Sequence, residues 1–473
     1  MTVRIPALVT LLILIGLLAG APAGLRAQHE TTLVRTTDST AATGGEEKPE
    51  PDPHTALPPD SLRQLADGVN YFHTYIPETR LSVHTVTVDL RNPRIDVRLG
   101  KGLDHMSGLE QAYSIMHRYD SVVTPIRVLA GINANFWKAG TLHPMGPTVI
   151  DGEMLVADKY RNWPSVAFTD HGQVLIDTFD LAVSLETRLG SIPISRLNRR
   201  VDSTEVVLYT TFAGSSVPFI DTVGIREASQ DTITDDSESR IDTLIMAHMD
   251  SVWSVSRESG TLKMQFTYIY PPLANTRIPC RVTALDTGFV AIPENGGVIS
   301  FGRGPFPLFS SLFVGDTFSI ASRLDPIVEE PVVQMTGGTP RIVRDGKVSV
   351  EWKEAGLTKI RFVEGHYGRS ALGISKGSDT LIMMTVEPYN RRHRRRGVPL
   401  QQLAELLIAR GAWQGTNLDG GSSATMVVEG ETRVPLAGNR GSRKISTALM
   451  VFERLGILTN RDFPKVRKIM RLE

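Results

Sequence analysis

The stretch Asn417-Leu418-Asp419-Gly420-Gly421-Ser422-Ser423-Ala424-Thr425-Met426 places one carboxylate before two glycines and two serines. Glycines let the backbone turn tightly and approach a ligand closely, and successive N–H groups in such a turn can cradle an anion. The residues Met426-Val427-Val428 then read as the start of a strand. Two interpretations remain open: a site for a polar ligand with Asp419 at its edge, or an ordinary turn that uses Asp and Gly in their usual roles.

The first 27 residues have the pattern of a secretory signal peptide. Arg4 gives a positive start, an apolar run extends from Ile5 to Leu18, and small residues allow cleavage after Ala23 or Ala27. The apolar run is too short for an ordinary membrane span. We therefore expect an exported, soluble protein, periplasmic or extracellular, with no stable membrane insertion.

Charge and cysteine content exclude several classes of site. Cys280 is the only cysteine, so an intramolecular disulfide and a cysteine-based metal centre are both excluded. Removal of residues 1–27 leaves 49 basic against 51 acidic residues, because Arg4 and Arg26 are lost. This balance argues against nucleic acid as a partner. The basic run Arg391-Arg392-His393-Arg394-Arg395-Arg396 reads as a solvated loop, with binding of an anionic polymer as the alternative.

After residues 1–27, the chain divides by composition into three parts. Residues 28–60 are rich in Thr, Ser, Gly, Glu and Pro and are interpreted as a disordered linker. Residues 61–455 are expected to form the folded domain, with a β-rich insertion around 221–330 that begins with an acidic surface segment at 221–242. Residues 456–473 form a basic tail to which the sequence assigns no role.

Local patterns indicate many strands and a few helices. Alternation over residues 81–90 predicts a half-buried strand, with residues 95–99 as its partner. The turns Asp151-Gly152 and Asp345-Gly346 predict hairpins. A capping box at residues 107–110 predicts a helix to about Tyr119, and a second helix is predicted over residues 399–410, followed by Gly411. We therefore expect an α+β fold of mixed β-sheets with a few helices.

Five motifs follow one another along the chain: Asn133-Ala134-Asn135-Phe136 with the loop to Gly146, Gly337-Gly338-Thr339-Pro340-Arg341-Ile342, Arg369 to Gly373, Leu418 to Ser423, and Arg443 to Leu449. In this order they resemble the motifs of the phosphodiester glycosidase family. The similarity spans roughly residues 80–210 and 330–453. The chain departs from the family pattern at two positions. It has His366-Tyr367-Gly368-Arg369 instead of His-Pro-Arg, and Val386-Glu387-Pro388-Tyr389 instead of Val-Asp-Gly-Arg.

The resemblance implies a phosphodiester-glycosidase-like domain that hydrolyses a sugar-1-phosphodiester or a related envelope or extracellular glycan at the anomeric carbon. Such a reaction develops positive charge on the sugar, which carboxylates stabilise. Asp419 and Glu387 are the candidate catalytic residues. Arginine forks suit phosphate oxygens, and amides suit sugar hydroxyls. The candidate substrate-binding residues are Asn133, Asn135, Arg369, Ser370, Gly420, Gly421, Ser422, Ser423 and Arg443. We predict that Asp419, Asn135, Arg369 and Arg443 share one pocket.

Structural roles remain open for these residues: the asparagines as turn formers, the arginines as strand caps or partners of Asp419, and Glu387 as a strand-end charge. Two other functions also remain open: a non-catalytic envelope polysaccharide-binding protein on the same scaffold, and a phosphodiesterase that cuts the P–O bond. No cofactor is required. A structural Ca²⁺ held by Asp419 and nearby oxygens is compatible with the sequence but not demanded by it. The sequence does not determine the oligomeric state.

Overall fold

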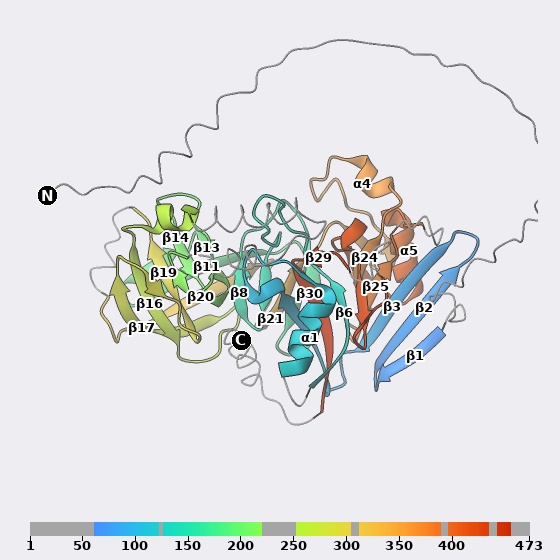
Figure 1. Ribbon diagram of the computed structural model, residues 1–473, viewed down its shortest axis with the longest axis horizontal. Helices are drawn as coiled ribbons and strands as arrows, with labels where there is room; N and C mark the ends of the chain where they lie inside the picture. The colour runs from blue at the N-terminus through green and yellow to red at the C-terminus, as the bar shows by residue number, and fades with distance from the viewer. Residues whose placement is uncertain are drawn as a thin grey trace, which may run out of the picture. The chain divides into compact units, whose positions relative to one another are not determined.

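The computed structural model describes residues 61–122, 126–219, 252–303, 312–388, 396–434 and 442–455. The signal peptide, the linker, the acidic segment at 221–242, residues 391–395 of the basic run and the C-terminal tail lie outside the described residues. Strands dominate, as expected, and nearly every pairing is antiparallel (Figure 1). Among the described strands only β13 and β14 pair in parallel. The helices include α1 (Ala112–Val122), α4 (Ile360–Glu364) and α5 (Leu400–Ala409), and residues 252–258 are also helical.

Two sheets enclose the core that carries the Asp419 turn. The first has the order β1-β2-β3-β25-β24-β26-β22-β23 and the second has the order β28-β27-β6-β30-β4. The strands of the first are β1 (Ser61–Ala66), β2 (Val69–Ile76), β3 (Leu81–Asp89), β25 (Thr380–Val386), β24 (Arg369–Ile374), β26 (Gln414–Asn417), β22 (Arg341–Arg344) and β23 (Lys347–Val348). Those of the second are β28 (Glu431–Thr432), β27 (Met426–Val428), β6 (Ile126–Asn133), β30 (Thr447–Arg454) and β4 (Ile95–Lys101).

Strand alternation sends neighbouring residues to different cores. In β3, Val86 and Val88 face the core shared by the two sheets, whereas Leu81 and Val83 pack under α5 on the opposite face. Helix α1 covers the outer face of the second sheet. Figure 1 shows α5 beside β24 and β25, and α1 beside β6 and β30. The residue parity along a strand therefore decides which core a side chain enters.

The predicted pairing of residues 81–90 with residues 95–99 is wrong. Strand β3 pairs with β2 and β25, while β4 pairs with β30 in the second sheet. Both strands bury one face in the same core, so alternation predicted their buried faces correctly but could not distinguish a hairpin from a crossing between sheets.

The first predicted helix starts later than the capping box indicated. Residues Glu110–Gln111 form β5 and pair with β29 (Lys444–Ile445), and α1 begins only at Ala112. The Glu110 carboxylate binds the Leu103 N–H and the Arg118 guanidinium instead of capping a helix. The second helix is confirmed, since α5 follows Pro399 and ends before Gly411, whose φ is 97°.

The predicted hairpin turns are confirmed. Asp151 and Gly152 have φ of 50° and 77° between β7 (Thr148–Ile150) and β8 (Glu153–Val156). Asp345 and Gly346 have φ of 52° and 70° between β22 and β23. Positive φ at both central residues is the type I′ geometry that matches strand twist. Strands β7 and β8 belong to a sheet of order β10-β9-β21-β7-β8, with β10 (Val174–Asp177), β9 (Ser165–Thr169) and β21 (Val332–Gly337).

The described part of the expected insertion contributes to a larger sheet. Its order is β12-β11-β20-β17-β16-β19-β14-β13, and its core includes Leu185, Phe266, Ile299 and Ile320. The strands before the insertion are β11 (Asp180–Thr187), β12 (Gly190–Pro193), β13 (Arg196–Leu197) and β14 (Val206–Tyr209). Those inside it are β16 (Leu262–Tyr268), β17 (Arg277–Asp286), β19 (Gly296–Phe301) and β20 (Thr317–Asp325). A short sheet pairs β15 (Ser216–Val217) with β18 (Val290–Ala291). The β-rich unit thus includes residues that precede position 221.

Candidate active site

The Asp419 turn crosses from β26 in the first sheet to β27 in the second. Hydrogen bonds at Asp419 and Gly421 help to hold its backbone. The Asp419 N–H donates to the Ala134 carbonyl at 3.2 Å, the Asn133 amide donates to the Asp419 carbonyl at 2.6 Å, and the Gly421 N–H donates to the Gly368 carbonyl at 2.7 Å. The turn is therefore fixed against the end of β6 and the residue before β24.

The Asp419 carboxyl group is half-buried and accepts the Gly420 N–H at 2.9 Å. Burial raises the pKa of this carboxyl to about 6, although the Ser423 hydroxyl, the Gly420 N–H and the Arg443 charge each oppose the shift. A carboxyl that titrates near neutral pH beside a cation has the electrostatic character of an acid–base or nucleophilic group. Asp419 is thus the described residue with the strongest claim to a chemical role.

Arg443 lies at the exposed rim of the turn. Its Nη1 donates to the Ser422 Oγ at 2.9 Å, and its guanidinium lies 5.3 Å from the centroid of the Trp137 ring. The pairing of β29 with β5 fixes the adjacent backbone. Arg443 and Ser422 can therefore donate to an anionic group that approaches Asp419, and Trp137 offers an apolar face beside it.

The Gly420–Ser423 backbone is less open than an anion cradle would be. The Gly420 N–H binds the Asp419 carboxylate, the Gly421 N–H binds Gly368, and the Ser423 N–H binds the Gly420 carbonyl at 3.2 Å. These bonds favour a turn that orients Asp419 over a turn that binds phosphate through its backbone. Gly421 still requires glycine, because its φ is 63°.

The two predicted asparagines have different surroundings. Asn133 uses its carbonyl oxygen to accept from the Ser370 hydroxyl at 2.7 Å and from the Thr425 N–H at 3.0 Å, so Asn133 and Ser370 position the turn from below. Asn135 is buried and bound by other partners. Its amide makes four bonds, to Met145, Thr148, Thr336 and Thr447. An amide has two donors and two lone pairs, so Asn135 has no capacity left for a sugar hydroxyl.

Arg369 does not join Asp419, although their backbones are close. Its side chain is buried on the α5 side of the sheet, opposite to Ser370. The guanidinium donates to the carbonyls of Phe362, Gly365 and Val398 at 2.7–3.1 Å. Burial lowers the pKa of this arginine to about 10. This placement favours the structural interpretation of Arg369, because adjacent strand residues face opposite sides.

Glu387 follows β25 and is buried in a polar cluster. Its Oε1 accepts from the Ser82 hydroxyl at 2.5 Å and lies 3.1 Å from the His84 Nε2. The His73 Nε2 lies 2.9 Å from the Ser82 Oγ, and the Tyr71 hydroxyl lies 2.8 Å from the His84 Nδ1. Glu387 is thus bound by a buried cluster of residues from β2 and β3 and is not an exposed charge at a strand end.

Sequence reasoning missed the histidines of this cluster. His73 pairs with His84 across β2 and β3, and His84 pairs with Thr385 of β25. The sequence did contain a signal for them. Ser82 and His84 lie on the same face of β3 as Val86 and Val88, which are buried in the core. Polar residues at core-facing positions are unusual without a partner or a function.

His73, His84 and Glu387 could also hold a metal ion, because one potential ligand atom from each lies within 4.8 Å of the others. Two imidazoles and a carboxylate are a donor set typical of zinc rather than calcium, which prefers six to eight oxygens. The Ser82 hydroxyl, however, already bridges His73 and Glu387. These bonds already occupy the His73 Nε2 and the Glu387 Oε1 atoms. The expected Ca²⁺ near Asp419 stays a prediction.

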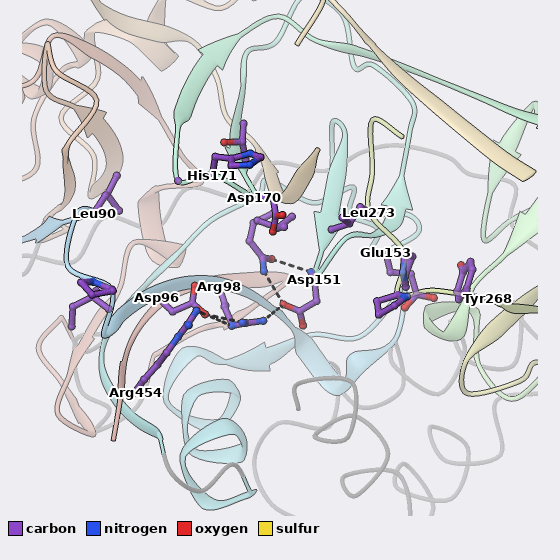
Figure 2. Close-up of a pocket in the computed structure, with 18 of the residues that line it drawn as sticks. Leu90, Asp96, Arg98, Asp151, Glu153, Asp170, His171, Tyr268, Leu273 and Arg454 are labelled. Carbon is purple, nitrogen blue, oxygen red and sulfur yellow. Dashed lines mark hydrogen bonds and ion pairs between the residues drawn. The ribbon is translucent and has the colours of Figure 1, made fainter. Parts of the chain in front are cut away.

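A large cavity lies away from the Asp419 turn. It has a volume of about 630 Å³ and none of the candidate site residues lines it. Figure 2 shows its charged lining, in which Arg98 bridges Asp96 and Asp151, both at 2.7 Å. Gln334 also donates to Asp151. Because these charges neutralise one another, size alone does not make this cavity the site.

The sequence is similar to known proteins in the part of the chain that contains this site. A family model described as phosphodiester glycosidase matches residues 284–452. N-acetylglucosamine-1-phosphodiester alpha-N-acetylglucosaminidase of Bos taurus is 29% identical over 140 residues, which are 26% of this chain and 26% of that protein. The aligned part is therefore about a quarter of the length of that relative.

Solved structures share the fold. A hypothetical protein from Synechocystis has a TM-score of 0.55 at 20% identity, and the alignment covers 84% of this chain and 64% of that one. A Burkholderia pseudomallei protein, whose name provisionally describes it as exported, has a TM-score of 0.52 at 17% identity, covering 78% and 74%. No helix among the described residues is long and apolar enough to cross a bilayer. The recognition drawn from the motifs is confirmed: residues 284–452 of this chain match the phosphodiester glycosidase family.

Proposed function

We propose that this protein is an exported glycosidase that hydrolyses sugar-1-phosphodiesters at the anomeric carbon. The observation that carries the proposal is the Asp419 carboxyl, whose pKa is raised to about 6 by burial, with the Arg443 charge beside it. A family match over residues 284–452 supplies the reaction class.

In the proposed reaction the bond between the anomeric carbon and the phosphate oxygen breaks. Water supplies a hydroxyl to the sugar, and a phosphate monoester leaves. Asp419 supplies negative charge at the anomeric carbon, either by attacking it or by deprotonating water, and the stereochemical outcome distinguishes the two. Arg443 and Ser422 donate to the phosphate oxygens, where charge develops as the bond breaks.

Glu387 is the second carboxylate of the proposal. It follows β25, and its contacts with Ser82 and His84 fix its orientation. The backbone around it approaches the Asp419 turn, since a Cβ placed on Gly368 would lie 2.7 Å from the Gly421 carbonyl and 2.8 Å from the Pro388 Cβ. A pair of carboxyl groups supported in this way is what a glycosidase needs.

Export rests on the signal-peptide pattern of residues 1–27, which lie outside the described residues. An exported enzyme of this class would meet sugar-phosphate polymers of the cell envelope or extracellular glycans. The non-catalytic alternative, an envelope polysaccharide-binding protein, uses the same surface without the chemistry.

The test is incubation of the mature protein with α- and β-linked N-acetylglucosamine-1-phosphodiesters, other sugar-1-phosphodiesters and a chromogenic glycoside, in ¹⁸O-water. Label in the sugar product supports the glycosidase, whereas label in the phosphate identifies a phosphodiesterase. Binding of these compounds without turnover, in wild type and in Asp419→Asn alike, would leave the polysaccharide-binding function instead.

A further inference from the structure

A second basic cluster lies on the β-rich unit, around Trp253. The Arg257 guanidinium lies 4.2 Å from the centroid of the Trp253 ring, and that of Arg199 lies 5.5 Å from it. Arg199 follows β13, whereas Trp253 and Arg257 belong to a helical segment at residues 252–258. Two arginines that share one indole are brought together against their mutual repulsion.

The neighbouring carboxylate does not neutralise these arginines. Glu258 is buried and binds Arg200 at 2.6 Å, and it also accepts from the Tyr209 and Ser300 hydroxyls. Among the described residues, neither Arg199 nor Arg257 forms an ion pair. The Asp202 carboxylate accepts the Thr204 hydroxyl, which lowers the pKa of Asp202, and the charge of Arg257 helps to lower it.

The cluster borders a small cavity of about 60 Å³, also lined by His105 and His143. Burial, together with the charges of Arg199, Lys101, His105 and Lys138, holds the pKa of His143 well below its usual value. All four of these neighbours are basic. A single water molecule needs only about 10–15 Å³ on this measure, so the cavity accommodates a small anionic group.

One loop connects this cluster with the Asp419 rim. The Lys138 N–H donates to the His143 carbonyl at 2.9 Å, and Trp137 forms a β-bridge with Pro144. Trp137 contacts Arg443 at the rim of the Asp419 turn, while His143 lines the cavity at Arg199. The two basic sites therefore flank a single short hairpin.

We propose that Arg199, Arg257 and Trp253 form an anion subsite that binds a second phosphate of a polyanionic glycan, beyond the phosphodiester at Asp419. Arginine forks bind phosphate through paired hydrogen bonds, and the ring of Trp253 holds both guanidinium groups in place. Binding of phosphate at the subsite stands on its own geometry, whereas its effect on substrate choice rests on the proposed function.

The binding experiment uses inorganic pyrophosphate as the probe, in an Arg443→Gln background that weakens the Asp419 rim. We expect pyrophosphate to change the fluorescence of Trp253, and this change to be absent in Trp253→Phe. The double variant R199Q/R257Q should weaken binding on the order of 10- to 100-fold. A matched control is R188Q/R323Q, which removes the same charge from two exposed arginines and should bind as the background does. Equal weakening by both pairs, or normal binding by R199Q/R257Q, would overturn the subsite.

A kinetic experiment tests whether the anion subsite contributes to the choice of substrate. With Arg443 intact, R199Q/R257Q should raise KM for a chain of several sugar-phosphate units about 10-fold and leave a substrate with one phosphodiester unchanged. An equal effect on both substrates would refute the role in chain recognition. If neither substrate is cleaved, the proposed function fails, and the pyrophosphate titration still decides the subsite.

Discussion

The side-chain amide of Asn133 donates to the backbone carbonyl of Asp419 at 2.6 Å, although 286 positions separate them. Asn133 also accepts from the Ser370 hydroxyl and the Thr425 N–H. One buried amide therefore ties the end of β6, the start of β24 and the Asp419 turn together. These contacts orient the turn without a ligand, which is the preorganisation that charge stabilisation needs.

Arg369 and Arg443 should separate stability from binding. Arg369→Gln leaves the carbonyls of Phe362, Gly365 and Val398 without their donors. We expect it to lower the free energy of unfolding by about 2–3 kcal/mol, measured by urea denaturation. Arg443→Gln, at an exposed site, should change stability by less than about 0.5 kcal/mol but raise KM. A stable Arg369→Gln protein with a raised KM would restore Arg369 to the substrate site.

The Ser82 hydroxyl should act on turnover through Glu387. Ser82→Ala removes the 2.5 Å bond to the Glu387 carboxylate and the link to His73. We expect kcat to fall about 10-fold with little change in KM, and Glu387→Gln to lower kcat further. Ser370→Ala, which removes a hydroxyl that contacts Asn133 from the same face, serves as a comparison. If Glu387→Gln changes the free energy of unfolding but not kcat, Glu387 is structural. Zinc titration of the His73, His84 and Glu387 cluster is then the next measurement.

Much of the geometry around the candidate site could be predicted from the sequence, because it depends on local signals. The glycines at Gly420 and Gly421 marked the turn, and strand ends marked Asn133. The face of Arg369 could also have been predicted, since Arg369 and Ser370 are consecutive strand residues and cannot both face one site. The partners of β3 and the role of His73 could not, because they depend on which distant strands pair.

Removal of the N-terminal segment should leave stability unchanged. The first described strand, β1, begins at Ser61 and pairs with β2, and the composition of residues 28–60 predicts little apolar burial. A chain that begins at Ser61 should melt within about 1 °C of one that begins at residue 28, which is less than a 1 kcal/mol change would cause. A drop of several degrees in calorimetry would mean that residues 28–60 pack on the domain.

Activity should rise with pH through about 6, because the Asp419 carboxyl, whose pKa is raised to about 6, must ionise to act. The kcat/KM profile on a sugar-1-phosphodiester tests this expectation. The Ser423 hydrogen bond lowers this pKa, so the rising limb should move to higher pH in Ser423→Ala. A profile already flat between pH 4 and 6 would mean that another group limits the reaction.

Asp419→Asn should separate chemistry from architecture. The Asn oxygen can still accept the Gly420 N–H, and the Ser423 hydroxyl can rotate to accept from the new amide, so the turn should persist. Turnover should fall about 100- to 1,000-fold, the usual effect of losing a group that stabilises developing charge.

The stability of Asp419→Asn should change in the opposite direction to its turnover. The folded pKa of about 6 exceeds the ordinary 3.8, so the folded state binds more protons between these values and the wild type loses stability as pH rises from about 4 to about 6. Asn carries no such penalty. In urea denaturation we therefore expect Asp419→Asn to match the wild type near pH 4 and to exceed it at pH 8. An active Asp419→Asn protein, or one that is less stable at pH 8, would show that Asp419 serves the turn rather than the reaction.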